Sequence, residues 1–182
     1  MAALLATPFA SCETGLSFPT ENIDMVSVVR MDTNQTLWLG MSQEDAERVL
    51  GAPLDPESNH WFKMYKNGIK AGFRDGVLCG MHLYQDGDAP GAYALKNGGG
   101  ACGGVAEDAV QTFEPDMVFD SNVWQALYEN VDGAWKPIVP EHFFEIEGEA
   151  DKNRYASVVI QPGDAGVQSI FVVELYYIRY LE

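Results

Sequence analysis

The feature that most constrains the fold is a set of three strand-like runs separated by two glycine-containing dipeptides. Asn67-Gly68 separates His60–Lys66 from Ile69–Arg74, and Asp75-Gly76 then leads into Val77–Tyr84. Asn-Gly and Asp-Gly close tight hairpins because both residues tolerate the positive φ angles that two-residue turns need. The pattern therefore predicts an antiparallel meander of three strands.

A short amphipathic helix is predicted ahead of this meander. Ser42 is a favourable N-cap, and Asp45 places an acidic side chain near the positive end of the helix. Gly51 and Pro53 end the segment, because glycine favours a C-terminal cap and proline cannot continue the helical hydrogen bonds. The apolar stripe at helical spacing consists of Ala46, Val49 and Leu50.

The second half of the chain repeats this order of elements. Glu107-Asp108-Ala109 echoes Glu44-Asp45-Ala46, and a helical stripe over Val105–Phe113 ends at Pro115. We interpret the similarity as a tandem duplication, although Glu-Asp-Ala is common at helix starts and could recur by coincidence. The strand candidates that follow are Val123–Tyr128, Trp135–Val139, His142–Ile146, Tyr155–Ile160 and Val167–Arg179.

These elements predict an α+β fold of two tandem repeats, each a short helical segment packed on an antiparallel β-meander. Residues 1–24 are expected to be a signal remnant or tether, and residues 25–88 the first repeat, which starts with a strand at 25–31. Residues 89–104, rich in glycine, are expected to be a linker, and 105–182 the second repeat.

The charge of the chain restricts its partners. It contains 11 Lys and Arg against 27 Asp and Glu, a net charge of −16. A negative field repels phosphate backbones and anionic lipids, so nucleic-acid binding is disfavoured and a basic partner is favoured. No run approaches the about 18 apolar residues that a membrane-spanning helix needs. Any membrane association is therefore expected only through a lipid anchor.

The amino-terminal segment contains a candidate anchor. An apolar run over residues 2–10 is followed by Ser11 and Cys12, which resembles the cleavage box of bacterial lipoproteins, where the cysteine thiol is lipidated. The basic residues that usually precede such a run are missing, so a frayed terminus with a chance cysteine is the alternative. The prediction is lipidation at Cys12 and an extracytoplasmic, membrane-anchored protein, with secretion as the alternative.

The two remaining cysteines leave two interpretations open. If Cys12 carries lipid, Cys79 and Cys102 are a possible disulfide pair, as export compartments permit. Two unpaired thiols, with Cys79 as a small core residue, are the alternative. Because there is no CxxC motif and the three histidines are far apart in sequence, neither a metal site nor another cofactor is expected.

A longer string of residues resembles a known family. Leu39–Ser42, Glu44–Ala46 and Val49–Pro53 resemble a segment of the small outer-membrane lipoproteins of the SmpA/OmlA type, and the β-lactamase-inhibitor proteins have that fold in duplicated form. The resemblance covers about residues 36–84 and is weak in the second half. It implies an exported, duplicated α+β protein that binds other proteins and has no catalytic residues. Because partners differ across one fold, it names no target.

Aromatic residues in the strand candidates are the expected binding residues. Exposed Trp and Tyr are favoured anchors of protein interfaces, because they bury a large area at a small entropic cost. We expect an aromatic sheet face to bind a protein or another cell-envelope component by surface complementarity. The candidates are Trp61, Tyr65, Phe73, Tyr84, Trp124, Tyr128, Trp135 and Phe143.

Two other functions are compatible with the sequence. A small hydrolase could use His142 with a neighbouring carboxylate from Glu141 or Glu145, but no nucleophile motif or phosphate-binding loop accompanies them. A passive structural role in the envelope is the other alternative. Binding without catalysis is the preferred prediction.

Overall fold

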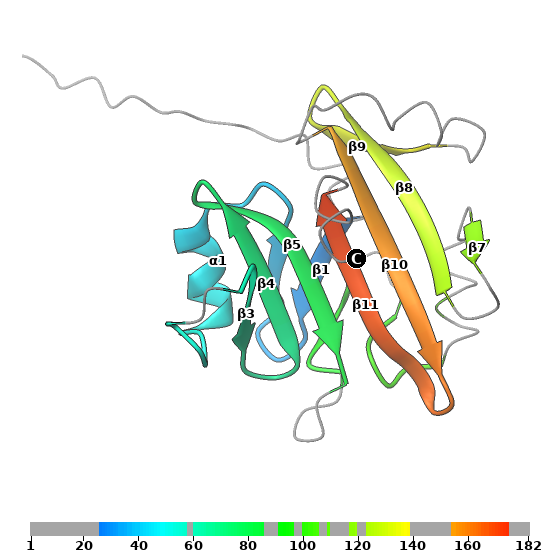
Figure 1. Ribbon diagram of the computed structural model, residues 1–182, viewed down its shortest axis with the longest axis horizontal. Coiled ribbons are helices and arrows are strands. Elements are labelled where there is room, and N and C mark those ends of the chain that lie inside the picture. Colours follow the sequence, from blue (N-terminus) through cyan, green and yellow to red (C-terminus); the bar gives the residue numbers. More distant parts are fainter. Residues whose placement is uncertain are drawn as a thin grey trace, which may run out of the picture.

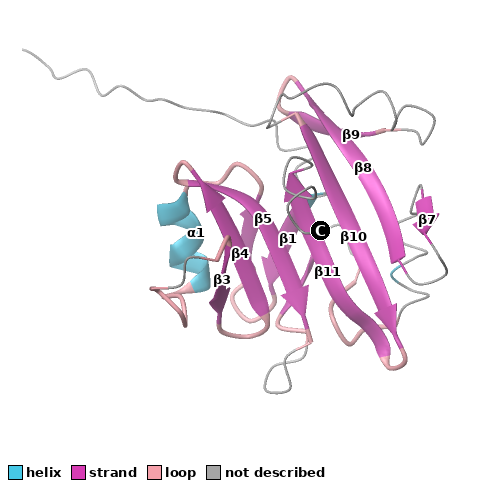
Figure 2. Cartoon of the chain, viewed as in Figure 1, coloured by secondary structure: helices cyan, strands magenta, loops and turns pink. Residues whose placement is uncertain are grey.

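The computed structural model describes residues 26–57, 60–85, 91–96, 100–105, 109, 117–119, 123–138 and 154–174. Of these described residues, 57% are in strands and 9% are helical. The prediction of an α+β fold with a helical segment in each repeat is therefore wrong. The structure is mostly β, with two antiparallel sheets (Figures 1 and 2).

The larger sheet has eight strands and runs through both halves of the chain. Its pairing order is β3-β4-β5-β11-β10-β8-β7, with β9 also paired to β8. β5 and β11 are the final strands of the two halves, and they pair antiparallel with Met81 opposite Val172. The bounds are β3 (Phe62–Tyr65), β4 (Ile69–Arg74), β5 (Val77–Tyr84), β7 (Met117–Phe119), β8 (Val123–Val131), β9 (Ala134–Pro137), β10 (Tyr155–Gly163) and β11 (Gly166–Glu174).

A second layer covers one face of this sheet. It consists of a three-stranded sheet in the order β2-β1-β6 and of a single helix, α1. In Figure 1, β1 lies behind β5 and β11, and α1 lies at the side of β3 and β4. The bounds are β1 (Ser27–Arg30), β2 (Gln35–Trp38), α1 (Gln43–Leu50) and β6 (Tyr93–Leu95). The two layers share one hydrophobic core.

The cover explains why the expected repeats differ from the structure. The apolar face of the large sheet is buried mainly by the strands β1, β2 and β6 and by α1, all from the first 95 residues. β6 lies inside the segment 89–104 that was expected to be a linker. In the second half, Val105 and Ala109 are the residues of the expected helix Val105–Phe113 that the structure describes; Ala109 is helical, and its N–H donates to the carbonyl oxygen of Val105.

The two predicted hairpins are confirmed. Asn67 and Gly68 have φ of 66° and 74°, and Asp75 and Gly76 have φ of 51° and 77°. Two successive residues with positive φ form the type of turn that matches the twist of antiparallel strands. β3, β4 and β5 consequently pair as neighbours, with a bulge between Gly72 and Phe73.

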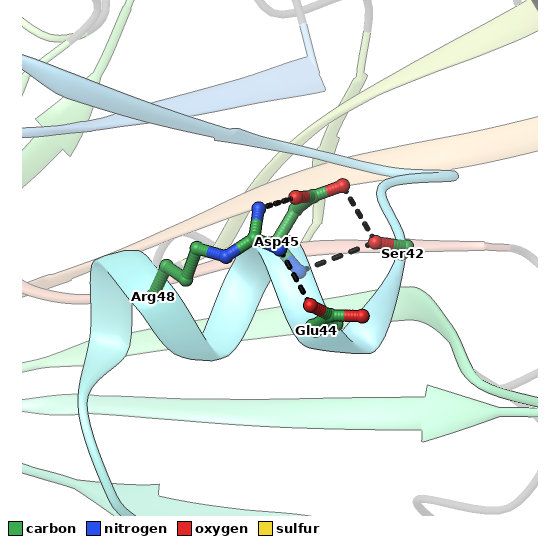
Figure 3. Close-up of polar contacts among 4 residues, drawn as sticks. All are labelled: Ser42, Glu44, Asp45 and Arg48. Atoms are coloured by element: carbon green, nitrogen blue, oxygen red, sulfur yellow. Dashed lines mark hydrogen bonds and ion pairs between the residues drawn. The ribbon is translucent and has the colours of Figure 1, made fainter.

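The predicted helix start is also confirmed. The Ser42 hydroxyl accepts a hydrogen bond from the Asp45 backbone N–H and donates one to the Asp45 carboxylate (Figure 3). Arg48 then pairs with both Glu44 and Asp45 on the exposed side of α1 (Figure 3). The opposite side packs Ala46, Val49 and Leu50 into the core, so the helix is fixed by its cap and its apolar stripe together.

The two described cysteines are buried, and neither forms a disulfide. The Cys79 thiol donates to the carbonyl oxygen of Gly72, and its neighbours are Phe62 and Val173. Cys102 belongs instead to the main core. They lie in different clusters of buried side chains, and the possible disulfide between them is not formed in this structure.

Candidate functional site

The two faces of the eight-stranded sheet differ in what their side chains contact. Side chains on the covered face pack against the small sheet and α1, whereas no described strand or helix packs on the other face, which we call the open face. The covered face includes Ile69, Met81, Leu83, Val158, Ile160, Ile170 and Val172. The open face includes Phe62, Lys70, His82, Tyr84, Val159, Gln161 and Phe171.

The structure separates the predicted aromatic residues rather than grouping them on one face. Tyr65, Tyr128 and Trp135 are buried in the core, and Trp124 and Phe73 are partly buried against it. These positions follow from the strand register: Tyr65, for example, pairs with Ile69 on the covered face. Phe143 lies outside the described residues. Two candidates, Trp61 and Tyr84, reach the surface, at different places.

Trp61 is the main element of a pocket at the edge of the large sheet. Its side chain is 51% exposed, an unusually high value for the largest apolar side chain. It lies just before the edge strand β3. A pocket of about 360 Å³, which we call the edge pocket, is lined by Gln43, His60, Trp61, Lys63 and Phe73.

Two residues that line the edge pocket contact segments that contain acidic residues. The Gln43 amide donates to Glu47 on the next turn of α1. The Lys63 ammonium contacts the carbonyl oxygen of Pro56, which lies between Asp55 and Glu57. The pocket thus combines two aromatic side chains with one lysine, and Glu47 lies one hydrogen bond away from its lining. An apolar side chain suits the aromatic lining, and the acidic chain favours basic groups around it.

Tyr84 belongs to a second concavity, on the open face, which we call the sheet depression. It has a volume of about 550 Å³ and is lined by His82, Tyr84, Gln85, Gln161, Gln168, Ser169 and Phe171. His82 stacks on Phe171, with ring centroids 3.8 Å apart and an interplanar angle of 11°. Tyr84 lies 5.7 Å from His82, and the Lys70 ammonium lies 5.3 Å from the Tyr84 ring centre.

The imidazole of His82 is neutral over most of the pH range. Its burial, with a smaller contribution from the Lys70 charge, lowers the pKa of His82 to about 4. Its Nε2 atom is buried and has no hydrogen-bond partner among the described residues. The atom is thus closed off from solvent, and the part of His82 that lines the depression belongs to the rest of its side chain.

Other predicted features lie outside the described residues. Cys12, the candidate lipidation site, and His142, the candidate catalytic residue, are both in this category. In the part of the chain that the structure describes, no group of His, Cys, Asp and Glu side chains could hold a metal ion. The same residues include no helix of the length and apolar character needed to cross a membrane.

Comparison of the chain with models of protein families, with curated proteins and with solved structures gave no match.

Sequence reasoning missed the polar part of the sheet depression. His82 and Phe171 are 89 positions apart in the sequence, and only the pairing of β5 with β11 brings them together. Gln161 and Gln168 flank the β10–β11 turn, beside a bulge at Gln161 and Pro162. The available signal was the turn Pro162-Gly163-Asp164 with a glutamine on each side, but local pattern does not show which strand lies next to it.

Proposed function

We propose that this protein is an exported, lipid-anchored binding module of the bacterial cell envelope that acts without catalysis. In this proposal, Cys12 carries the lipid and the edge pocket binds a protein partner. The observation that carries the proposal is the exposure of Trp61, which lines the edge pocket together with Phe73. Export and anchoring are supported by the sequence around Cys12 and by the resemblance to envelope lipoproteins.

Trp61 is half exposed, whereas another tryptophan of the chain is buried. A tryptophan of the same chain, Trp135, is only 5% exposed, which shows that the fold can bury this side chain. Transfer of a half-exposed indole into an interface removes apolar area from water at a small cost in rotamer entropy. Trp61 is therefore the side chain with most to gain from a partner.

The charge distribution indicates the chemistry of the partner. The net charge of −16 and the carboxylates near Gln43 and Pro56 favour a partner surface that carries Lys or Arg around an apolar side chain. Long-range attraction between such surfaces raises the association rate, and added salt screens it. The proposed complex should therefore form more slowly at high ionic strength.

The proposal is tested by chemical crosslinking in the native envelope, with the captured protein identified by mass spectrometry. Trp61→Ala should lower the yield of a dominant crosslinked species by about tenfold or more, as expected for an interface anchor. Met31→Ala is the matched control, because Met31 is an exposed apolar side chain, 58% accessible, in the β1–β2 turn. Equal yields from wild type and Trp61→Ala would exclude the edge pocket as the binding site.

The anchor is tested separately by metabolic labelling with an alkyne-bearing fatty acid. Wild-type protein should incorporate the label and sediment with membranes. Cys12→Ser should lose both properties and keep its binding partner, because the edge pocket is formed by other residues. Incorporation of the label by the Cys12→Ser variant would overturn the assignment of the lipid to this cysteine.

A further inference from the structure

The sheet depression is separate from the edge pocket and combines two kinds of surface. Its floor consists of the rings of His82, Phe171 and Tyr84, which lie against one another on the open face. Its walls carry the side-chain amides of three glutamines and the hydroxyl of Ser169. Concave sites with a largely apolar floor and a few polar groups that converge on it are the usual form of small-molecule and saccharide sites.

The polar groups of the walls are available to a ligand. Within the described residues, the side-chain amides of Gln85 and Gln168 form no hydrogen bond, and Gln161 accepts one from Ser169 through its Oε1. Each glutamine amide can donate two hydrogen bonds and accept others. Together they present donors and acceptors side by side, as a row of hydroxyl groups requires.

None of the described residues that line the depression is charged, in contrast to the acidic composition of the chain. The charged side chains nearest to it among the described residues are Lys70, which lies beside the Tyr84 ring, and Asp164, which lines a neighbouring depression of about 550 Å³. His82 is neutral because of its burial. An ionic ligand would thus find little compensation for its lost hydration, whereas a neutral ligand with many hydroxyl groups would find matching partners.

The position of the depression also argues against an extended peptide. β5, β10 and β11 are interior strands, each paired on both sides. At the rim, the Gln85 N–H donates to the carbonyl oxygen of Gln168. A peptide cannot add to this part of the sheet as a further strand, so recognition must use side chains alone.

We propose that the sheet depression binds a neutral saccharide. One ring would lie with its apolar C–H face on Tyr84 and the stacked pair of His82 and Phe171, and its hydroxyl groups would bond to the glutamine amides. The neighbouring depression shares Gln85, Gln161 and Gln168 and would accept an adjacent ring, so the ligand would be part of a longer glycan chain. This site is distinct from the edge pocket and does not depend on the proposed function.

The test is titration calorimetry of the full chain with three neutral hexasaccharides: cellohexaose, maltohexaose and chitohexaose. We expect at least one to bind with a Kd below about 1 mM. Gln168→Ala should raise this Kd about tenfold, since it removes an exposed amide and leaves the core intact. Gln35→Ala, which changes an exposed glutamine of β2 in the other sheet, is the matched control and should bind as wild type does.

A nuclear magnetic resonance titration locates the ligand. The ring signals of His82 and Tyr84 should shift with the same saturation curve as the calorimetric heat, and Trp61→Ala should not alter it. The proposal is overturned if none of the three hexasaccharides binds below about 1 mM, or if Gln168→Ala binds like wild type. It is equally overturned if the depression crosslinks to a protein partner in the envelope while the hexasaccharides leave the ring signals unchanged.

Discussion

The two faces of the eight-stranded sheet are made from alternate residues of the same strands, and they differ in chemistry. In β11, Ile170 and Val172 face the cover and are fully buried, whereas Phe171 between them faces the open side and remains partly exposed. In β5, Met81 and Leu83 alternate with His82 and Tyr84 in the same way. The alternation places apolar side chains on the covered face and aromatic and amide side chains on the open face of the same strands.

Both candidate sites lie where the cover of the large sheet ends or is absent. The edge pocket is formed where the large sheet ends beside α1, and the sheet depression where the open face ends at the β10–β11 turn. At the sheet depression, strand alternation brings aromatic side chains to the open face, whereas Trp61 lies just before the first residue of β3. No described helix or strand covers either place. The candidate binding residues are therefore those that the cover does not reach.

The largest effect is expected from truncation on the covered face. Ile170→Ala should lower the free energy of unfolding by about 3–4 kcal/mol, because a fully buried side chain in the centre of the sheet would leave a cavity. Phe171→Ala, one residue further on, should lower it by only about 1–2 kcal/mol, because the ring is partly exposed and faces away from the cover. Urea denaturation of the two variants measures both values.

The order of these two effects is the informative result. Phenylalanine is the larger side chain, so a ranking by size alone predicts the greater loss for Phe171→Ala. Equal losses, or a greater loss at Phe171, would mean that the open face is packed as tightly as the covered face. In that case neither the open face nor the sheet depression would be available to a ligand.

Local sequence pattern predicted the elements that depend on neighbouring residues. The turns at Asn67-Gly68 and Asp75-Gly76 and the cap at Ser42 were predicted because their conformations depend on one or two residue types. β6, by contrast, has three residues in a glycine-rich segment and is stabilised by pairing with β1, more than 60 positions away. A strand of this length has too little pattern of its own to be predicted.

The face to which each aromatic residue points could not be predicted from alternation alone. Trp61 and Tyr65 have the same parity, yet Trp61 is half exposed and Tyr65 is fully buried. The difference arises at the end of the sheet, where the cover no longer extends over the strand. The site residues contributed by β10 and β11 depend on long-range pairing, which a single sequence does not reveal.

Two buried titratable groups should give the stability opposite dependences on pH. Burial raises the pKa of Glu174 to about 7, despite its ion pair with Arg74 at 2.7 Å, so the native state binds a proton that the unfolded state releases at lower pH. Stability from this group therefore falls as pH rises from about 4.5 to 7. The pKa of His82 is lowered instead, so its contribution to the free energy of unfolding has the opposite pH dependence. That contribution rises as pH increases from about 4 to 6.5.

Single variants should separate the two contributions. Glu174→Gln leaves His82 as the dominant group, so its free energy of unfolding should increase between pH 5 and pH 6.5 more than that of wild type. His82→Phe leaves Glu174, so its free energy of unfolding should decrease between pH 5 and pH 7. Urea denaturation at these pH values provides the measurement. Parallel pH profiles for the two variants would contradict the assignment of opposite signs.

The smallest effect is expected at the end of α1, which belongs to the cover but meets water on one side. Ser42→Ala removes the hydroxyl that caps the Asp45 N–H and should lower the free energy of unfolding by about 1 kcal/mol. Arg48→Ala removes ion pairs with Glu44 and Asp45 that are exposed to solvent, and it should change the free energy of unfolding less than Ser42→Ala does. Neither change should alter binding at the sheet depression, because α1 packs on the covered face. If Ser42→Ala lowered the free energy of unfolding as much as Ile170→Ala does, the cover would fold only when this helix is capped. The buried face would then depend on the helix as much as on its own side chains.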